Sequence, residues 1–217
     1  MFANLAGKAS NHLTVFAAGC IACGSPGSGS AELGPVRTVS TTSAPIIGGV
    51  DSPSTDNAVV QVAAFKGGEL TRDVASGTLV APNLVMTARH NVAPQLQTED
   101  RVDCRPGKTQ VMFGPTVPVD DRRVFVGPES RSYSANPAGA LRIKRIIVGP
   151  SLALCDSDVA FLILEQPIHD IEPASLRLFS PPSVSETVSV VGFGFSSSTG
   201  DRAAVRQRLD GLQITGY

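Results

Sequence analysis

Short apolar runs recur along residues 59–214, and none of them keeps a helical period for more than two turns. Clusters of Gly, Pro, Asn, Asp and Ser separate the runs, as turn residues separate strands. The pattern predicts strands over Val59–Phe65, Gly77–Val80, Leu84–Ala88, Thr109–Phe113, Val124–Val126, Leu141–Val148, Val159–Leu164, Val188–Phe193 and Val205–Ile214. Many short strands without a long helix are typical of an all-β sandwich or barrel.

The first 45 residues follow a different pattern. Lys8 precedes the mostly apolar run Leu13–Ala22, and Ala17-Ala-Gly-Cys20 has the small residues of a cleavage site, so residues 1–22 are predicted to be a signal peptide. The run is too short to span a bilayer, which takes about 20 residues. Residues 23–45 are rich in Gly, Ser and Pro and bury too little surface to fold alone, which indicates a linker or a propeptide.

Two cysteines fall near the predicted cleavage site. Ala-Ala-Gly-Cys resembles a bacterial lipoprotein box, in which Cys20 would carry the lipid, and Cys23 is a second candidate for lipidation. The same pair spells C-x-x-C, a redox or metal pattern, but no βαβ context or second pair follows to complete a zinc site. We therefore expect no metal, and contact with a membrane only through a lipid anchor. The expected location is the bacterial cell envelope or the extracellular space.

The length of the chain limits its domain organisation, and its net charge limits the class of partner. A chain of 217 residues can hold one large β domain or two small barrels. The formal net charge is -1 and no long Lys/Arg cluster occurs, so nucleic acid is not expected as a partner.

Histidine is scarce, with His12, His90 and His169 as its only occurrences. His12 lies in the predicted signal peptide and His169 in a polar, Pro-containing turn. His90 ends an apolar run, and Asp158 begins another. An imidazole held by a carboxylate is the arrangement that activates a serine hydroxyl for acyl transfer. Taken alone, each residue also has an ordinary structural explanation.

Three motifs occur in a fixed order: Ile46-Ile-Gly-Gly, Thr87-Ala-Arg-His and Asp158-Val-Ala-Phe. They resemble the trypsin-like (chymotrypsin-fold) serine protease family, and the resemblance implies antiparallel β-barrels that act on protein or peptide substrates without a cofactor. It implies His90 as general base, Asp158 rather than Asp156 as its orienting carboxylate, and Ile46 as the N-terminus released on activation. Pro45 stands before Ile46, so the activating cleavage would need a specificity other than the usual Arg or Lys.

The resemblance also divides the chain. Residues 46–180 would form a complete first barrel, and residues 181–217 would begin a second barrel, where Val190-Val-Gly-Phe-Gly resembles the family's Gly-Trp-Gly. The family's Gly-Asp-Ser-Gly-Gly motif does not occur before Tyr217. We therefore expect a truncated second barrel, no nucleophile in this chain, and no activity as it stands. The alternatives are a non-catalytic, protease-like binding module and a truncated gene product.

The family usually has a cysteine directly after its histidine, where this chain has Asn91. Cys104 and Cys155 remain outside the signal region, and a disulfide between them is expected in an exported protein. By chain-entropy reasoning such a bond stabilises by roughly 4 kcal/mol. The alternative is two free, buried cysteines.

Overall fold

The structure, a computed structural model, describes residues 46–97, 102–105, 107–108, 110–129, 137–194 and 205–216, without the side chains of Arg72 and Asp156. Strands dominate this part of the chain, and its one α-helix, α1 (Leu154–Ser157), has four residues. All pairings between the strands are antiparallel. The predicted all-β class is therefore confirmed. None of the described helices is long and apolar enough to cross a membrane.

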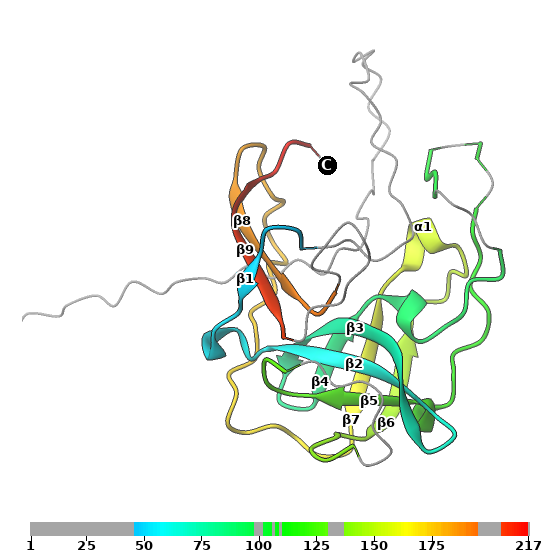
Figure 1. Cartoon of the computed structure of the whole chain (residues 1–217). Coiled ribbons are helices and arrows are strands. Elements are labelled where there is room, and N and C mark those ends of the chain that lie inside the picture. Colours follow the sequence, from blue (N-terminus) through cyan, green and yellow to red (C-terminus); the bar gives the residue numbers. More distant parts are fainter. Residues whose placement is uncertain are drawn as a thin grey trace, which may run out of the picture.

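The larger sheet has six strands (Figure 1). Their order is β5 (Arg122–Phe125), β2 (Val59–Lys66), β3 (Glu69–Ala81), β4 (Leu84–Thr87), β7 (Ala160–Leu164) and β6 (Ile143–Val148). The two edges of the sheet meet where Val124 of β5 exchanges backbone hydrogen bonds of 3.1 and 2.8 Å with Leu141, just before β6. This contact closes the sheet on itself.

The interior of the closed sheet is the main core. Strand residues that alternate along β2, β4 and β7 point inward, as the two-residue period of a strand requires. The fully or almost fully buried members are Val60, Val62, Leu79, Val85, Val92, Val124, Ile143, Ala160, Leu162, Leu164 and Ile168. Gly77 of β3 belongs to this packing, because a Cβ there would lie 2.7 Å from Val85 Cγ1.

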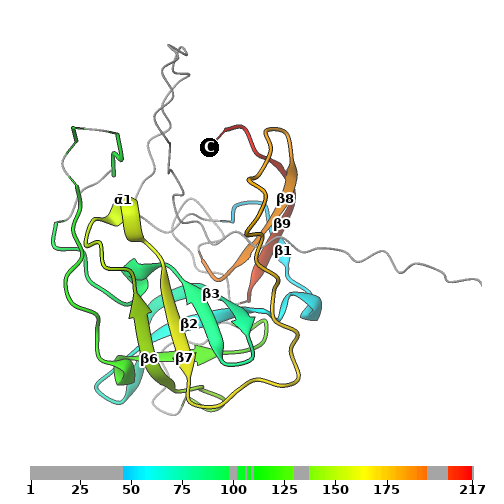
Figure 2. The ribbon, with the colours of Figure 1, turned by 180° about the vertical axis from the view of Figure 1, so that it is seen from behind.

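The smaller sheet joins the start and the end of the described chain. β1 (Val50–Asp51) pairs with β9 (Gln207–Gln213), and β9 pairs with β8 (Thr187–Gly192). β8 also contacts β2 and β3 of the larger sheet. Figures 1 and 2 show the smaller sheet beside one end of β2 and β3, with α1 on the other side of the molecule.

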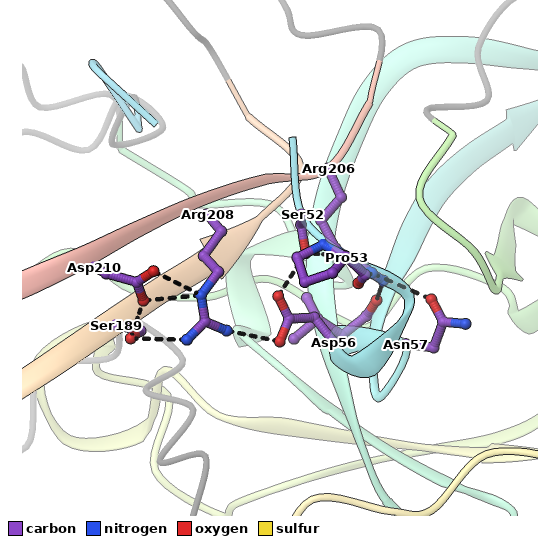
Figure 3. A network of polar contacts seen from close by, with 9 residues as sticks. Ser52, Pro53, Asp56, Asn57, Ser189, Arg206, Arg208 and Asp210 are labelled. Atoms are coloured by element: carbon purple, nitrogen blue, oxygen red, sulfur yellow. Dashed lines mark hydrogen bonds and ion pairs between the residues drawn. The ribbon is translucent and has the colours of Figure 1, made fainter. Parts of the chain in front are cut away.

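Two arginines at the start of β9 connect this sheet to the segment before β2 (Figure 3). Arg206 is completely buried and donates to Ser52 Oγ at 3.0 Å, Val59 O at 2.8 Å, Pro53 O at 2.8 Å and Asn57 Oδ1 at 3.1 Å. Burial lowers the pKa of this guanidinium, and the charge of Asp56 opposes that shift.

Asp56 connects the two arginines. Its carboxylate accepts from Ser52 Oγ at 2.7 Å and from Arg208 Nη1 at 2.7 Å. Arg208 in turn donates to Asp210 and Ser189 on the smaller sheet, and the hydrogen bond that it donates to the Asp210 carboxylate is the main reason that the pKa of Arg208 is raised. Polar side chains therefore hold the two sheets together at this point.

Two local predictions were wrong or too short, and one short element was not predicted. Residues 110–113 form no strand and make only isolated bridges, Met112 with Ala153 and Phe113 with Gln95. β3 begins at Glu69, eight residues before the predicted Gly77, because the glycines at 67 and 68 form a tight hairpin turn that continues the ladder from β2. The short helix α1 was not predicted.

Candidate active site

His90 lies in a short 3-10 helix, Arg89–Asn91, that follows β4. Thr87, the last residue of β4, is buried, and its hydroxyl donates to the Ser76 carbonyl at 2.8 Å. The Asn91 side-chain amide donates to the same hydroxyl at 3.0 Å. These two hydrogen bonds fasten the turn that carries His90 to the end of the sheet.

The pairing of β4 with β7 brings Asp158 to His90. Thr87 lies opposite Ala160 in the antiparallel ladder, so the end of β4 and the start of β7 lie side by side. His90 follows β4 by three residues and Asp158 precedes β7 by two. Strand register thus places these two residues together although they are 68 positions apart in sequence.

Both oxygens of the Asp158 carboxylate bind His90. Oδ2 lies 2.9 Å from Nδ1 of the ring, and Oδ1 accepts the backbone N–H of His90 at 3.0 Å. The Asp158 side chain is only 13% exposed, whereas the His90 ring is 41% exposed. The carboxylate is therefore shielded, and the ring that it holds is open to solvent.

This geometry indicates which of the two ring nitrogens carries the proton when His90 is neutral. A carboxylate at Nδ1 favours the tautomer with the proton on Nδ1, because the ionised carboxylate can only accept a hydrogen bond. Nε2 is then free of its proton and can accept one from a nucleophile, and the carboxylate stabilises the imidazolium that results. The arrangement can therefore carry out general base catalysis.

A family model described as a trypsin-like peptidase domain matches residues 75–213, a range that includes His90 and Asp158. The matched range covers more than half of the chain. The chain belongs to the trypsin-like peptidase family. A search of curated proteins found no match.

Solved structures of similar fold include the crystal structure of the scabies mite inactivated protease paralogue S-D1. This structure matches the chain with a TM-score of 0.51 and 17% identity, over 79% of the chain's length. The chain spans 64% of the length of that protein. At this identity the likeness shows the fold alone, and it agrees with the predicted chymotrypsin-like architecture.

The disulfide of this chain lies next to the candidate site. Cys104 and Cys155 are bonded, with their Cα atoms 5.5 Å apart, and Cys155 precedes Asp158 by three residues. The hydrogen bonds from Arg105 hold the pKa of Asp103, beside the disulfide, at about 2.

Both cysteines pack against a second apolar cluster, which contains Ala93, Val102, Val111, Phe113 and Leu154. Ala93 closely follows His90 in the sequence, and Leu154 closely precedes Asp158. One cluster therefore supports both sides of the site.

Ile46, the predicted activation N-terminus, is buried and lies in a turn closed by a 3.2 Å hydrogen bond from the Gly49 N–H to the Ile46 carbonyl. Its Cδ1 atom approaches Gly192, where a Cβ would lie 3.8 Å away. At the same point, Ser76 Oγ accepts the Phe193 N–H at 2.8 Å. The segment that begins at Ile46 therefore lies against the end of β8.

The remaining residues singled out in the sequence lie elsewhere. Cys20 and Cys23 fall outside the described residues, as does the side chain of Asp156. His169 is described and exposed. Within the described ranges, no group of three His, Cys, Asp or Glu side chains could hold a metal ion.

Sequence reasoning missed Arg89, which is 2% exposed. Arg89 directly precedes His90, and its side chain extends to the loop that precedes Asp158. The available signal was the arginine in Thr-Ala-Arg-His, at a position where the resembled family has alanine.

Proposed function

We propose that this chain supplies the general base and the orienting carboxylate of a serine-type endopeptidase that acts on protein or peptide substrates. The observation that carries the proposal is the contact of 2.9 Å between His90 Nδ1 and Asp158 Oδ2. The second oxygen of Asp158 holds the backbone of the same histidine, so the ring has one orientation relative to the carboxylate. Such a carboxylate contributes about 10⁴ in kcat where it has been tested in serine proteases.

The proposed chemistry also needs a nucleophile, and the 217 residues contain no Gly-Asp-Ser-Gly-Gly. Removal of the serine from a triad enzyme lowers kcat by about 10⁶. We therefore propose that residues 1–217 do not hydrolyse peptides by themselves. Ser196, Ser197 and Ser198, which follow the Gly-Phe-Gly-Phe stretch, lie outside the described residues.

Two measurements on the 217-residue chain test these proposals. Long-range ¹H–¹⁵N NMR correlations of the His90 ring at about pH 8, where an ordinary imidazole is neutral, distinguish the two tautomers. We expect the proton on Nδ1, and a shift towards the other tautomer in Asp158→Asn. An Asp158→Asn spectrum identical to that of the parent would refute the role of Asp158.

The second measurement is labelling with a fluorophosphonate, together with a peptide hydrolysis assay. We expect no labelling and no hydrolysis above background. Stoichiometric labelling that is abolished in His90→Ala would show that another serine of the chain acts as nucleophile, and would refute the proposed inactivity.

The alternative function is a non-catalytic, protease-like binding module, with which the absence of Gly-Asp-Ser-Gly-Gly from these 217 residues is compatible. The reading frame beyond the Tyr217 codon distinguishes the two functions. An in-frame Gly-Asp-Ser-Gly-Gly supports the peptidase, and an immediate stop codon supports the binding module.

Export and activation belong to the same proposal. We propose an oxidising compartment outside the cytosol, which the Cys104–Cys155 disulfide supports. Cleavage before Ile46 would release the proposed activation N-terminus. Edman sequencing of the protein from its native source tests this step, and a mature chain that retains residues before Ile46 would contradict it.

A further inference from the structure

The side chain of Arg89 is buried directly beside the candidate site. It is 2% exposed, and its guanidinium carbon lies 4.7 Å from the centre of the Phe113 ring. Its Nη1 atom faces three oxygen atoms of one loop, namely Gly149 O at 3.2 Å, Ser151 O, and Ser157 Oγ at 3.2 Å. Its Nε atom has no hydrogen-bond partner in the described part of the protein.

A buried arginine is unusual, because moving a charge out of water costs several kcal/mol. Here neutral oxygens and an aromatic face offset that cost, since each can interact favourably with a cation. Nη1 carries only two protons, so its three acceptors must share them. All three belong to the segment 149–157, which ends immediately before Asp158.

We propose that Arg89 is a positioning residue for the His90–Asp158 pair, an inference that rests on the proposed function of that pair. Residues 89 and 90 are adjacent in the sequence, as are residues 157 and 158. Two side-chain contacts join the first pair to the second. Arg89 binds Ser157, and His90 binds Asp158. The first connection restricts the path of the backbone that carries the carboxylate.

Gly149 contributes to the same arrangement. A Cβ at this position would lie 2.8 Å from Ser157 Oγ, so the absence of a side chain lets the Ser157 hydroxyl approach the start of the loop. Arg89 therefore binds both ends of a closed loop at once.

The middle of the loop is fixed by other contacts. The Phe113 N–H donates to Leu152 O at 2.8 Å, and the Leu154 N–H donates to Val111 O at 2.8 Å. The disulfide at Cys155 adds a covalent tie. Loss of the Arg89 hydrogen bonds should therefore loosen residues 149–151 and 157–158 without unfolding the loop.

The test uses the tautomer ratio of the His90 ring in the 217-residue chain at about pH 8. Arg89→Met keeps an apolar stem and removes every donor, whereas Arg89→Lys keeps the positive charge but loses the planar guanidinium. Ser157→Ala removes one acceptor and leaves Arg89 in place. Arg142→Met is the matched control, because Arg142 is an exposed arginine whose partners are Asp120 and Glu165.

We expect the ratio of the Nδ1–H to the Nε2–H tautomer to fall by roughly two- to tenfold in Arg89→Met, the effect of weakening about one hydrogen bond. Ser157→Ala should cause a smaller fall in the same direction, Arg89→Lys should recover part of the loss, and Arg142→Met should match the parent.

An unchanged ratio in folded Arg89→Met would overturn the positioning role, provided that Asp158→Asn changes the ratio. If Arg89→Met does not fold, Ser157→Ala decides, and a ratio equal to that of the parent overturns the role. An unchanged ratio in Asp158→Asn would instead refute the proposed function on which this inference rests.

Discussion

Replacement of Arg206 by methionine tests how strongly the buried guanidinium holds the two sheets together (Figure 3). Methionine keeps a flexible apolar stem and donates no hydrogen bond. The inner acceptors, Ser52 Oγ and Val59 O, would lose this donor inside the protein, where an unpaired polar group costs about 1–3 kcal/mol. The acceptors on Pro53 and Asn57 are nearer the surface and can bind water instead. We therefore expect the free energy of unfolding to fall by about 2–6 kcal/mol.

Urea unfolding of the 217-residue chain at pH 7 measures this loss as a lower midpoint at an unchanged slope. The matched control is Arg142→Met, because the Arg142 side chain is 54% exposed and its two ion pairs should contribute only about 0–1 kcal/mol. Arg206→Lys should fall between the parent and Arg206→Met, since one ammonium cannot replace a guanidinium that binds four acceptors. An Arg206→Met variant as stable as Arg142→Met would refute the reasoning.

Three further variants test the core and the disulfide by the same unfolding assay. Leu162→Ala removes a completely buried side chain of β7 and should destabilise by about 2–5 kcal/mol; a loss below 1 kcal/mol would contradict the core assignment. Gly77→Ala should cost about 1–3 kcal/mol, because its Cβ would collide with Val85, and an equally stable variant would show that β3 can move away. Cys104→Ser frees Cys155 and should destabilise by about 4 kcal/mol, whereas a parent-like midpoint would mean that the bond adds no stability.

Hydrophobic periodicity predicted most of the strands because one face of each packs into a common interior. β7 alternates between buried and partly buried residues along its whole length, and β2 is almost continuously apolar. The first half of β3 escaped prediction because Glu69, Thr71 and Asp73 interrupt its apolar residues. Its alternation is present, with Leu70 and Val74 buried between the polar positions, but its polar face obscured it.

The sequence predicted those residues of the candidate site that belong to motifs. It did not predict the residues whose role depends on their burial. His90 and Asp158 stand at the ends of apolar runs, so their motifs indicated both residues. Nothing in the sequence indicates that Arg206 is buried, and the only signal for Arg89 is its place in Thr-Ala-Arg-His, which singles the residue out without predicting its burial. Arginine is almost always exposed, and its burial depends on acceptors from distant segments. The acceptors of Arg206 include Ser52, which lies 154 positions away.

Because β1 pairs with β9, the smaller sheet can form only after β9 has been synthesised. Residues 59–164 contain every strand of the larger sheet and can pair before β9 exists. Arg206, by contrast, is synthesised 154 residues after its partner Ser52. At ordinary rates of translation this separation corresponds to a delay of about 8–30 s. During that interval Asp56 has neither Arg206 nor Arg208 to offset its charge. We therefore expect the smaller sheet to form as a late, long-range step of assembly.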